Sequence, residues 1–415
     1  MQKASFFTVI LLFYMLLLSG CNTTKQALSP FQVRKSTLAM EENPEVSNQA
    51  LQTLSQANNL LSFDLYSAKE NNVYSAYSLF GLLNMLSSGA NAQTKTQILH
   101  TLHQSKESHP AFNALHKKLM QHSDNFHVQS TNALWLQEGF DVKKPFLDTL
   151  ALHYGLGVYL LDFQKDTSKS TQIINDWIAE KTKNTIPKLL AENAINTQTK
   201  LILTNALYLK GDWVHKFPQQ RTLFKNFTLL DNTLTQVQTM HQENNFLYSE
   251  LNHTKILSMP YLHSDYALLS IMPPEGEFAH FSETFNPQIF SIMIENLTPT
   301  KLNLYYPRYT FSSKRNFINP LKNHGMVDAF TQSADFSGIS DQALYISQII
   351  QQTTISVDEN GTEAAAATSI SIGTTSIPTQ PALEVKFDHP FLFALYHIPT
   401  KTILFYGQML NPSNQ

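Results

Sequence analysis

The chain has 415 residues, of which 42% are hydrophobic and 15% are charged, and its formal net charge is −3. A chain of this length buries a large core, in one domain or two. The weak net charge excludes the basic surface expected of a protein that binds nucleic acid or an anionic membrane. Alternating apolar segments and amphipathic segments without a regular βαβ repeat indicate an α+β fold.

The N-terminal segment has the pattern of a secretion signal. Lys3 precedes an apolar run from Phe6 to Leu18 that is too short to span a bilayer comfortably. The run ends in Leu-Ser-Gly-Cys21, which resembles a bacterial lipobox. Cys21 is the only cysteine, so no disulfide forms within the chain. We therefore expect Cys21 to carry a lipid anchor, and the alternative is an ordinary cleaved signal peptide with an incidental cysteine.

This interpretation divides the chain into three parts. We expect a lipoprotein signal peptide over 1–20, a polar flexible tether over 21–48 and a folded domain over 49–415. Asn22, rather than aspartate, follows the cysteine, which in enterobacterial-type sorting favours the outer membrane. The expected location is therefore the bacterial cell envelope, on a side of the outer membrane that the sequence does not identify.

Motifs for catalysis or cofactor binding are missing from the sequence. It contains no Gly-x-Ser-x-Gly and no His-Glu-x-x-His, and Gly155-Leu-Gly157 lacks the third glycine of a phosphate-binding loop. Six histidines lie between His100 and His127, and the spacing of His100 and His103 would place them on one helix face, as in some metal sites. An ordinary polar helix surface is the favoured interpretation, so we expect no catalytic residue, metal or cofactor.

The most informative segment begins at Glu359 and contains no bulky side chain from Gly361 to Thr368. Read with a period of two, one face of it carries small residues first and apolar residues later: Thr362, Ala364, Ala366, Thr368, Ile370 and Ile372. That face suits a strand that slips between two existing strands, whereas the nearby Gly, Thr and Pro residues suit an exposed loop. The segment therefore predicts a conformational switch.

This segment resembles the hinge of the serpins, a family of protease inhibitors that trap their targets by loop insertion. Further fragments resemble the family in the family's order: Asn72–Ser78, Leu86–Ile98, Thr204–Trp213, Pro307–Tyr309, Gly325–Phe330, Ala334–Ile339, Leu344–Ser347, His389–Phe393 and Ile403–Pro412. The resemblance implies the serpin fold, with three β-sheets, surrounding helices and an exposed reactive-centre loop. It also implies that the chain is an inhibitor rather than an enzyme.

In the mechanism that the resemblance implies, a serine or cysteine protease attacks the loop and forms an acyl-enzyme. The cleaved loop then enters the central sheet as a new strand, which distorts the protease before hydrolysis and requires a metastable native state. Gly361 would be the flexible hinge, and Thr362 the first side chain to insert. The expected hinge residues are Glu359, Gly361, Thr362, Glu363, Ala364, Ala365, Ala366, Ala367 and Thr368.

Family spacing from Glu359 places the cleaved bond between Thr375 and Ser376. A bond slightly downstream is the alternative, because the stretch from Thr379 to Leu383 is longer than usual. Thr375 offers neither a charge nor a ring to a specificity pocket. We therefore expect elastase-like or subtilisin-like serine proteases with shallow pockets as targets.

The resemblance also implies where the sheet opens. Trp213 would pack at the breach, where insertion begins, and Ser75, Ser78 and Asn205 would belong to the shutter that holds the sheet closed. Two residues depart from the family pattern, because Ala76 follows Ser75 where a proline is usual and Gln351 replaces a common buried histidine. We therefore expect a shutter network that is looser or rearranged.

Two other functions compete with the inhibitory one. A non-inhibitory serpin acting as a binding or carrier protein usually has bulky or charged residues in its hinge, which this chain lacks. A lipoprotein hydrolase would need a nucleophile motif, and none was found. The expected partners are therefore a target protease and a membrane reached through the lipid anchor, with no nucleic acid, and the expected state is a monomer.

Overall fold

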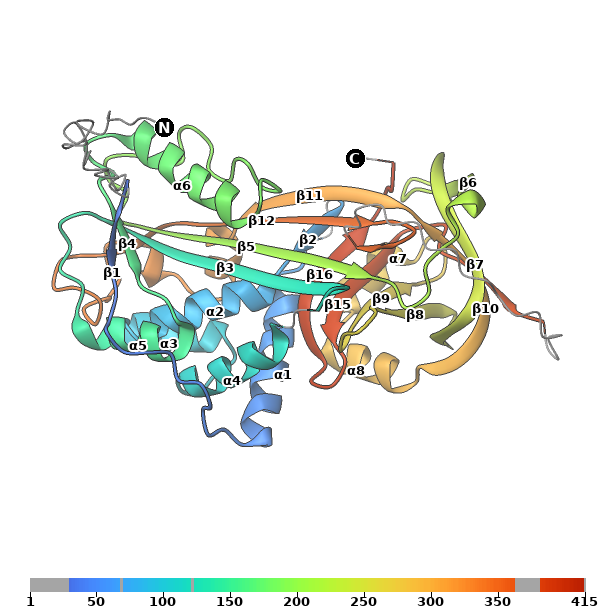
Figure 1. Cartoon of the computed structure of the whole chain (residues 1–415), viewed down its shortest axis with the longest axis horizontal. Helices are drawn as coiled ribbons and strands as arrows, with labels where there is room; N and C mark the ends of the chain where they lie inside the picture. Colours follow the sequence, from blue (N-terminus) through green and yellow to red (C-terminus); the bar gives the residue numbers. More distant parts are fainter. Residues whose placement is uncertain (1–29, 68–69, 121–122, 363–380, 414–415) are drawn as a thin grey trace, which may run out of the picture.

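The computed structural model describes residues 30–67, 70–120, 123–362 and 381–413 (Figure 1). Several predicted positions lie outside the described residues: Cys21, Glu363, Ala364, Ala365, Ala366, Ala367, Thr368, Thr375 and Ser376. The signal peptide lies outside them as well. Within the described part, no helix is both long and apolar enough to cross a membrane.

The described strands form two sheets. The order of the seven-stranded sheet is β1 (Gln32–Arg34), β4 (Val158–Leu161), β3 (Phe126–Gln137), β5 (Leu201–Asp212), β13 (Gly361–Thr362), β12 (Ile346–Val357) and β11 (Tyr309–Asn316). The order of the nine-stranded sheet is β14 (Leu383–Lys386), β10 (Thr298–Pro307), β7 (Leu234–Leu251), β8 (Thr254–Pro260), β9 (Tyr266–Met272), β15 (Phe391–His397), β16 (Thr402–Met409) and β2 (Asn72–Tyr74), while β6 (Leu223–Thr228) pairs with β7.

The α+β class is confirmed, but hydrogen bonding joins two of the three expected sheets into one. The reason is the length of β7, which has 18 residues. It pairs with β10 along one edge and with β6 and β8 along the other, and Thr239 alone faces both Pro307 and Leu223. A strand this long continues from one sheet into the next without a break in the ladder.

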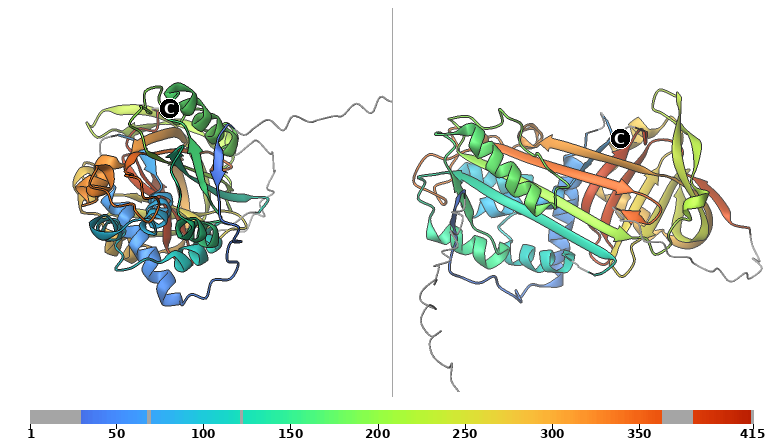
Figure 2. Two further views of the ribbon diagram at one scale, coloured as in Figure 1. Left: turned by 90° about the vertical axis from the view of Figure 1, so that its left-hand side faces the viewer. Right: turned by 45° about the horizontal axis from the view of Figure 1, so that its top comes forward.

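Helices cover both faces of the seven-stranded sheet (Figures 1 and 2). One face carries α1 (Asn48–Asp64), α2 (Ala76–Ser87), α3 (Ala92–Thr101), α4 (His109–Leu119) and α5 (Lys144–Tyr154), and the other carries α6 (Thr167–Lys181). The remaining helices are α7 (Phe278–Thr284), α8 (Pro287–Glu295) and α9 (Ile318–Asn323), with short 3-10 turns η1 (Gln219–Arg221) and η2 (Asp328–Phe330). Every residue of α2 is buried, so this helix is the centre of the core.

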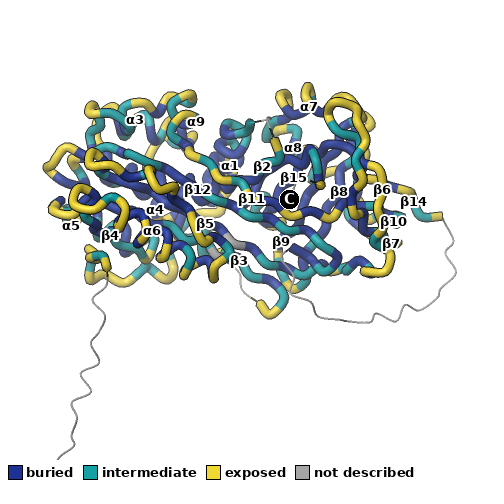
Figure 3. The backbone as a smooth tube through the Cα atoms, turned by 90° about the horizontal axis from the view of Figure 1, so that it is seen from above, coloured by how far each residue is buried: buried dark blue, intermediate teal, exposed yellow. Residues whose placement is uncertain are grey.

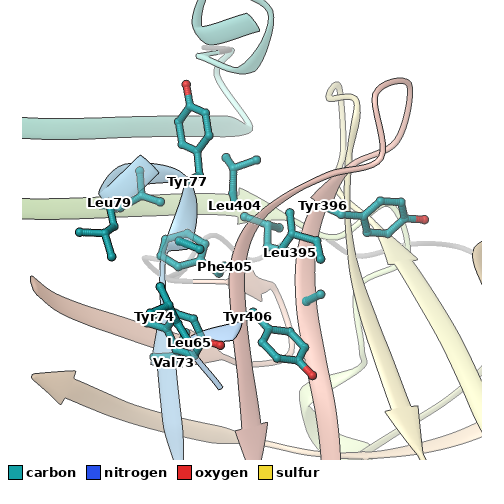
Figure 4. Close-up of a cluster of buried hydrophobic side chains, with 14 of the residues drawn as sticks. Leu65, Val73, Tyr74, Tyr77, Leu79, Leu395, Tyr396, Leu404, Phe405 and Tyr406 are labelled. Carbon is teal, nitrogen blue, oxygen red and sulfur yellow. The ribbon is translucent and has the colours of Figure 1, made fainter. Parts of the chain in front are cut away.

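Two apolar cores lie on opposite faces of this sheet. The larger contains α2 and the nine-stranded sheet, and Figure 4 shows Tyr74 and Tyr77 beside Leu404, Phe405 and Tyr406 of β16. The smaller core lies under α6, where the rings of Trp135 and Trp177 meet edge to face at 5.3 Å. Buried residues follow the strands of both sheets, and exposed residues gather in the loops (Figure 3). The central strands of the seven-stranded sheet are therefore buried on both faces.

The flexible tether expected over 21–48 is wrong for its described part. Residues 32–34 form β1, which pairs antiparallel with β4 at the edge of the seven-stranded sheet. The ring of Phe31 packs edge-on against Trp135 at 5.6 Å and Tyr159 at 5.2 Å. Farther along, the backbone N–H of Glu41 donates to the carbonyl of Leu152 in α5. The segment 31–42, called the strap below, is held by this pairing and packing, so the folded body begins well before residue 49.

Candidate functional site

The site lies along the seam between β5 and β12, at the centre of the seven-stranded sheet. Over part of their length these two strands pair directly in parallel, from Ile346 opposite Leu201 to Thr353 opposite Leu207. Beyond this closed part, β13 stands between them, with Gly361 opposite Asp212 on β5 and Thr362 opposite Val357 on β12. The seam is therefore closed along one part and occupied by two residues at its hinge end.

Gly361 occupies a position where no other residue fits. A Cβ atom added to it would lie 1.8 Å from the carbonyl oxygen of Gly211, which belongs to the backbone of the neighbouring strand. Rigid backbone cannot withdraw by that distance, so the close pairing of β13 with β5 depends on glycine.

Thr362 is the last described residue before the expected loop, and it is buried. Its hydroxyl shares a 2.6 Å hydrogen bond with the hydroxyl of Tyr261, whose pKa is raised far above its usual value by burial. The ring of Tyr261 stacks on Trp213 with 4.6 Å between centroids. The first side chain that enters the seam thus meets a polar partner inside an otherwise apolar pocket.

The turn before β13 is held by an aspartate and by Trp213. The Asp358 carboxylate accepts hydrogen bonds from the backbone N–H groups of Asn360 at 2.8 Å and Gly361 at 3.2 Å. The indole N–H of Trp213 donates to the Asp358 carbonyl at 2.9 Å, and its backbone N–H donates to the Asn360 carbonyl at 2.8 Å. Trp213 therefore fixes the backbone that leads into the hinge.

Glu359 is a buried carboxylate with few partners. It accepts a hydrogen bond from the Thr222 hydroxyl at 2.6 Å, and the Arg308 guanidinium lies 3.7 Å from its other oxygen. The backbone N–H of Phe217 donates to its carbonyl at 2.8 Å. These contacts attach the start of the hinge to Phe217, to Thr222 just before β6 and to Arg308 just before β11.

Gln351 holds the closed part of the seam with its side-chain amide. Its Oε1 accepts from the backbone N–H of Ser75 at 2.8 Å, while its Nε2 donates to the Ser75 carbonyl and to Asn205 Oδ1, each at 2.9 Å. The Thr353 hydroxyl also donates to Oε1, at 3.4 Å. An amide has two donors and one acceptor oxygen, and all are used. The side-chain amide of Gln351 is therefore fully bonded, and the network around it is not loose.

Two serines and one asparagine extend this network to β3. Ser75 caps α2, because its Oγ accepts from the Ser78 backbone N–H at 3.1 Å, and the two hydroxyls also bond. Ser78 reaches the Ser130 hydroxyl at 3.4 Å. Asn205 donates to Asn132 Oδ1 at 2.7 Å. The network joins β12, β5, β3 and α2, so separating β5 from β12 must break the Gln351–Asn205 bond.

The structure therefore gathers the predicted residues into two groups along one seam. Ser75, Ser78, Asn205 and Gln351 form one, and Trp213 forms the other with Glu359, Gly361 and Thr362. Sequence reasoning missed several partners in these groups: Thr222, Ser130, Asn132, Tyr261 and Asp358. Of these, Asp358 alone carried a signal, because Asp358 lies two residues before Asn360-Gly361, and Asp, Asn and Gly are typical of turns.

The histidines considered as metal ligands are arranged differently from the expected helix face. His103 lies beyond the end of α3 in a left-handed conformation, and its Nε2 contacts the Asp64 carboxylate at 2.6 Å. Among the residues described, no group of three or more His, Cys, Asp or Glu side chains could hold a metal ion.

Comparisons with known proteins agree on one family. The family described as Serpin (serine protease inhibitor) matches residues 56–412. An uncharacterized serpin-like protein of Methanosarcina mazei is 31% identical over 412 residues, covering 96% of this chain and 95% of the relative. Plasminogen activator inhibitor 1 of Bos taurus is 32% identical over 358 residues, covering 83% and 88%.

Solved structures show the same architecture. The thermophilic serpin tengpin in its native state superposes with a TM-score of 0.81 at 27% identity, covering 91% of this chain and 97% of tengpin. Human thyroxine-binding globulin complexed with thyroxine gives 0.80 at 25% identity, covering 88% and 100%. Similar architecture thus accompanies different functions among these neighbours.

Proposed function

This chain belongs to the serpin family of serine protease inhibitors, and we propose from this premise that it is an inhibitory member. In this proposal a target protease cleaves the loop after residue 362, and the freed segment enters the seam between β5 and β12. The protease, still joined to the loop as an acyl-enzyme, is carried along the sheet and trapped. The chain supplies a bait and a sheet, and it performs no turnover.

The observation that carries the proposal is that β5 and β12 pair directly along one part of the seam and are separated by β13 at its hinge end. The residues that would enter next are small, from Ala364 to Ala367. Small side chains pass between packed strands with little clash, whereas the bulky or charged hinges of non-inhibitory relatives would not.

Completing the sheet supplies the driving force. An inserted strand of about fourteen residues would add roughly ten ladder hydrogen bonds at about 1 kcal/mol net each, besides apolar burial. That sum is comparable to the whole stability of a typical domain. The free energy released by insertion is thus comparable to the free energy needed to distort a protease.

The proposed bait bond joins Thr375 and Ser376, and the proposed targets are elastase-like or subtilisin-like serine proteases. A threonine before the cleaved bond is small and uncharged, which fits a shallow specificity pocket. Trypsin-like proteases, whose pocket seeks a cation, should be inhibited poorly.

The proposed location is a bacterial membrane surface, reached through a lipid on Cys21 after removal of residues 1–20. The support is the Leu-Ser-Gly-Cys21 sequence and the single cysteine of the chain. In this proposal the protein is a monomer of the cell envelope. Replacement Cys21→Ala should move it to the soluble fraction, and a variant that stays membrane-bound in high salt would contradict the anchor.

A carrier protein is the second candidate. One observation favours it, a groove of about 1130 Å³ between α1, α8 and the turn that joins β15 to β16, because a ligand site is concave. Leu51, Phe290 and Lys401 are among its lining residues. A carrier would bind a small molecule there without forming a covalent complex with any protease.

A protease panel separates the two candidates. The purified chain is incubated with pancreatic elastase, subtilisin and trypsin, and covalent complexes are detected as bands that survive boiling in detergent. Elastase or subtilisin should give such a band, and the released C-terminal fragment should start at Ser376. Simple cleavage without any stable band, by every protease of the panel, would contradict the inhibitory function.

A further inference from the structure

One β-hairpin exposes an unusual share of apolar side chains. Of the eleven large hydrophobic residues exposed among those described, four lie in the twelve residues from Leu223 to Leu234. Their exposed fractions are high: Leu223 59%, Phe224 65%, Leu230 50% and Leu234 62%. Strand β6, the turn after it and the first residue of β7 form this segment, called the apolar hairpin below.

The outer face of the two paired strands has no charged side chain, because Lys225 lies with Leu223 on the other face and Asp231 lies in the turn. Cross-strand pairing places Phe224 opposite Gln238, Asn226 opposite Gln236 and Thr228 opposite Leu234. Side chains of paired residues share a face, and Asn226 and Gln236 are also hydrogen-bonded to each other. A partner that approaches this face loses little hydration of charge, so an uncharged, partly apolar surface would suit it.

The hairpin also presents an open strand edge. The backbone N–H of Thr228 points away from β7 and donates to the carbonyl of Asp388. Because backbone groups alternate along an antiparallel strand, those of Phe224 and Asn226 point outward as well. No hydrogen bond from either N–H to the rest of the described chain is recorded on that side. Such an edge is available to another polypeptide.

The apolar hairpin lies beside the base of the proposed bait loop. Thr222, the residue before β6, donates its hydroxyl to Glu359, two residues before Gly361. The chain after the loop re-enters the same nine-stranded sheet as β14, which starts at the exposed residue Leu383. In Figure 1 β6, β7, β10 and β14 lie together at one end of the molecule. A protein bound to the loop would therefore stand next to the hairpin.

The size and place of the hairpin select its occupant. Phe224 and Leu234 on the outer face, with Leu230 in the turn, offer about 300 Å² of apolar surface, an ordinary size for the largest patch on a monomer. A stable dimer needs about 800 Å² from each partner, so a second copy would be held poorly. A membrane is disfavoured by position, since β1, where the described chain begins, lies at the opposite end (Figure 1). A partner already held by the loop needs no larger surface.

We propose that the apolar hairpin is an accessory docking surface for the body of the target protease, and this inference rests on the proposed inhibitory function. Phe224 and Leu234, which share the outer face, contact an uncharged, apolar surface beside the active-site cleft of the protease. The contact acts before acylation, by lengthening the encounter while the bait bond enters the active site. It takes no part in strand insertion, which occurs in the other sheet.

The test compares a double substitution with a matched control. Phe224→Ser with Leu234→Ser removes the apolar contact, and Ile292→Ser removes a side chain of α8 that is 53% exposed elsewhere on the surface. The association rate constant and the stoichiometry of inhibition are measured with pancreatic elastase and subtilisin. For the protease that the parent chain inhibits faster, the double variant should associate about ten-fold more slowly with unchanged stoichiometry, and the control should match the parent.

Each other outcome overturns a distinct statement. Equal rates for parent and double variant would end the docking inference and leave the inhibitory function standing. No covalent complex with the parent chain would end both. A rise in substrate turnover would mean that the hairpin acts on the hinge through Thr222 and Glu359, against docking. A dimer of the parent that sedimentation detects and the double variant loses would assign the surface to a second copy, also against docking.

Discussion

The two parts of the seam between β5 and β12 depend on different kinds of interaction. At the hinge end, where β13 lies between β5 and β12, the fit depends on the missing side chain of Gly361. In the closed part, the strands are held together by the side chain of Gln351 and its bonds to Ser75 and Asn205. In the proposed mechanism, the hinge end thus decides which side chains can enter the sheet, and the closed part decides how hard the sheet is to open.

The difference has an energetic consequence. Gly361 acts by exclusion, because a larger residue would collide with backbone that cannot move. Gln351 acts by attraction, and net hydrogen bonds of about 1 kcal/mol each can be exchanged for new ladder bonds as a strand arrives. A change at Gly361 should therefore abolish insertion, whereas a change at Gln351 should alter stability and the ease of opening.

The largest effect is expected from Gly361→Val. Its Cβ would meet the Gly211 carbonyl oxygen, so β13 cannot keep its place next to β5 and the hinge cannot lead insertion. The variant should be cleaved as a substrate, with covalent trapping reduced at least about 100-fold. Stoichiometry of inhibition against the protease that the parent traps is the measurement.

Asn360→Ala is the matched control for this substitution, since the recorded contacts of Asn360 use its backbone. It should trap the protease nearly as well as the parent. Full trapping by Gly361→Val would show that the hinge end tolerates a side chain, and the contrast between the two parts of the seam would be lost.

The second effect is expected from Gln351→Leu. Leucine is similar in size but leaves the Ser75 backbone groups and the Asn205 amide oxygen buried without this partner. The Ser75 carbonyl still accepts from the Leu79 N–H, and the two groups left unpaired cost about 1–3 kcal/mol each, so the free energy of unfolding should fall by roughly 2–6 kcal/mol. Denaturant unfolding of the uncleaved chain measures it.

Gln352→Leu provides the comparison, because Gln352 follows on the same strand and is more exposed. It should change the free energy of unfolding by less than about 1 kcal/mol. If both leucine variants lose the same stability, then Gln351 does not hold the seam, and the closed part owes its cohesion to the ladder alone.

These two positions also show what the sequence could predict. The order of short motifs over the whole chain predicted the fold, and it placed Gln351, Ser75 and Asn205 in one region. It did not predict which atoms bond, because the Gln351 amide stands where a histidine is common and makes its own set of hydrogen bonds to Ser75 and Asn205. The Tyr261–Thr362 pair joins residues 101 positions apart and leaves no local pattern to detect.

The strap was missed for a related reason. β1 has three residues, Gln-Val-Arg, which are too few and too polar to predict a strand. Gly155 and Gly157 had been considered only as an incomplete phosphate loop. A Cβ on Gly157 would lie 2.5 Å from the carbonyl oxygen of Arg34, so this glycine makes room for the strap. Its purpose is visible only once the distant segments are together.

A third and smaller effect is expected at the edge of the same sheet, far from the seam. Phe31→Ala removes a partly buried ring from Trp135 and Tyr159, which should lower the free energy of unfolding by about 1–2 kcal/mol. Val33→Ala, at a side chain that is 50% exposed, is the control and should change it by less than about 0.5 kcal/mol. Denaturant unfolding compares the two. An equal loss in both variants would mean that the ring contributes no more than an exposed side chain.

The smallest effect concerns the response of stability to pH and the hydrogen bonds that hold the closed part of the seam. The recorded bonds of Gln351 go to Ser75, Asn205 and Thr353, which do not titrate, so acid should not act on this network directly. The whole protein still responds to acid, because burial lowers the pKa of His116 and of His397 to about 4. Unfolding lets these groups bind protons more readily, so stability falls as the pH drops from about 6.5 toward 4.

Gln351→His adds a buried histidine to the closed part of the seam. A buried imidazole that accepts from the Ser75 N–H must stay neutral, so its pKa should lie below the unfolded value of about 6.5. Its contribution to stability is then present above that pH and is lost as the pH falls. The measurement is the difference in unfolding free energy between parent and variant, which should be constant from pH 8 to about 7 and widen below about 6.5. A difference that stays constant down to pH 5 would mean that water or a rotated side chain accommodates the proton, and that the closed part is less tightly bonded than the contacts of Gln351 indicate.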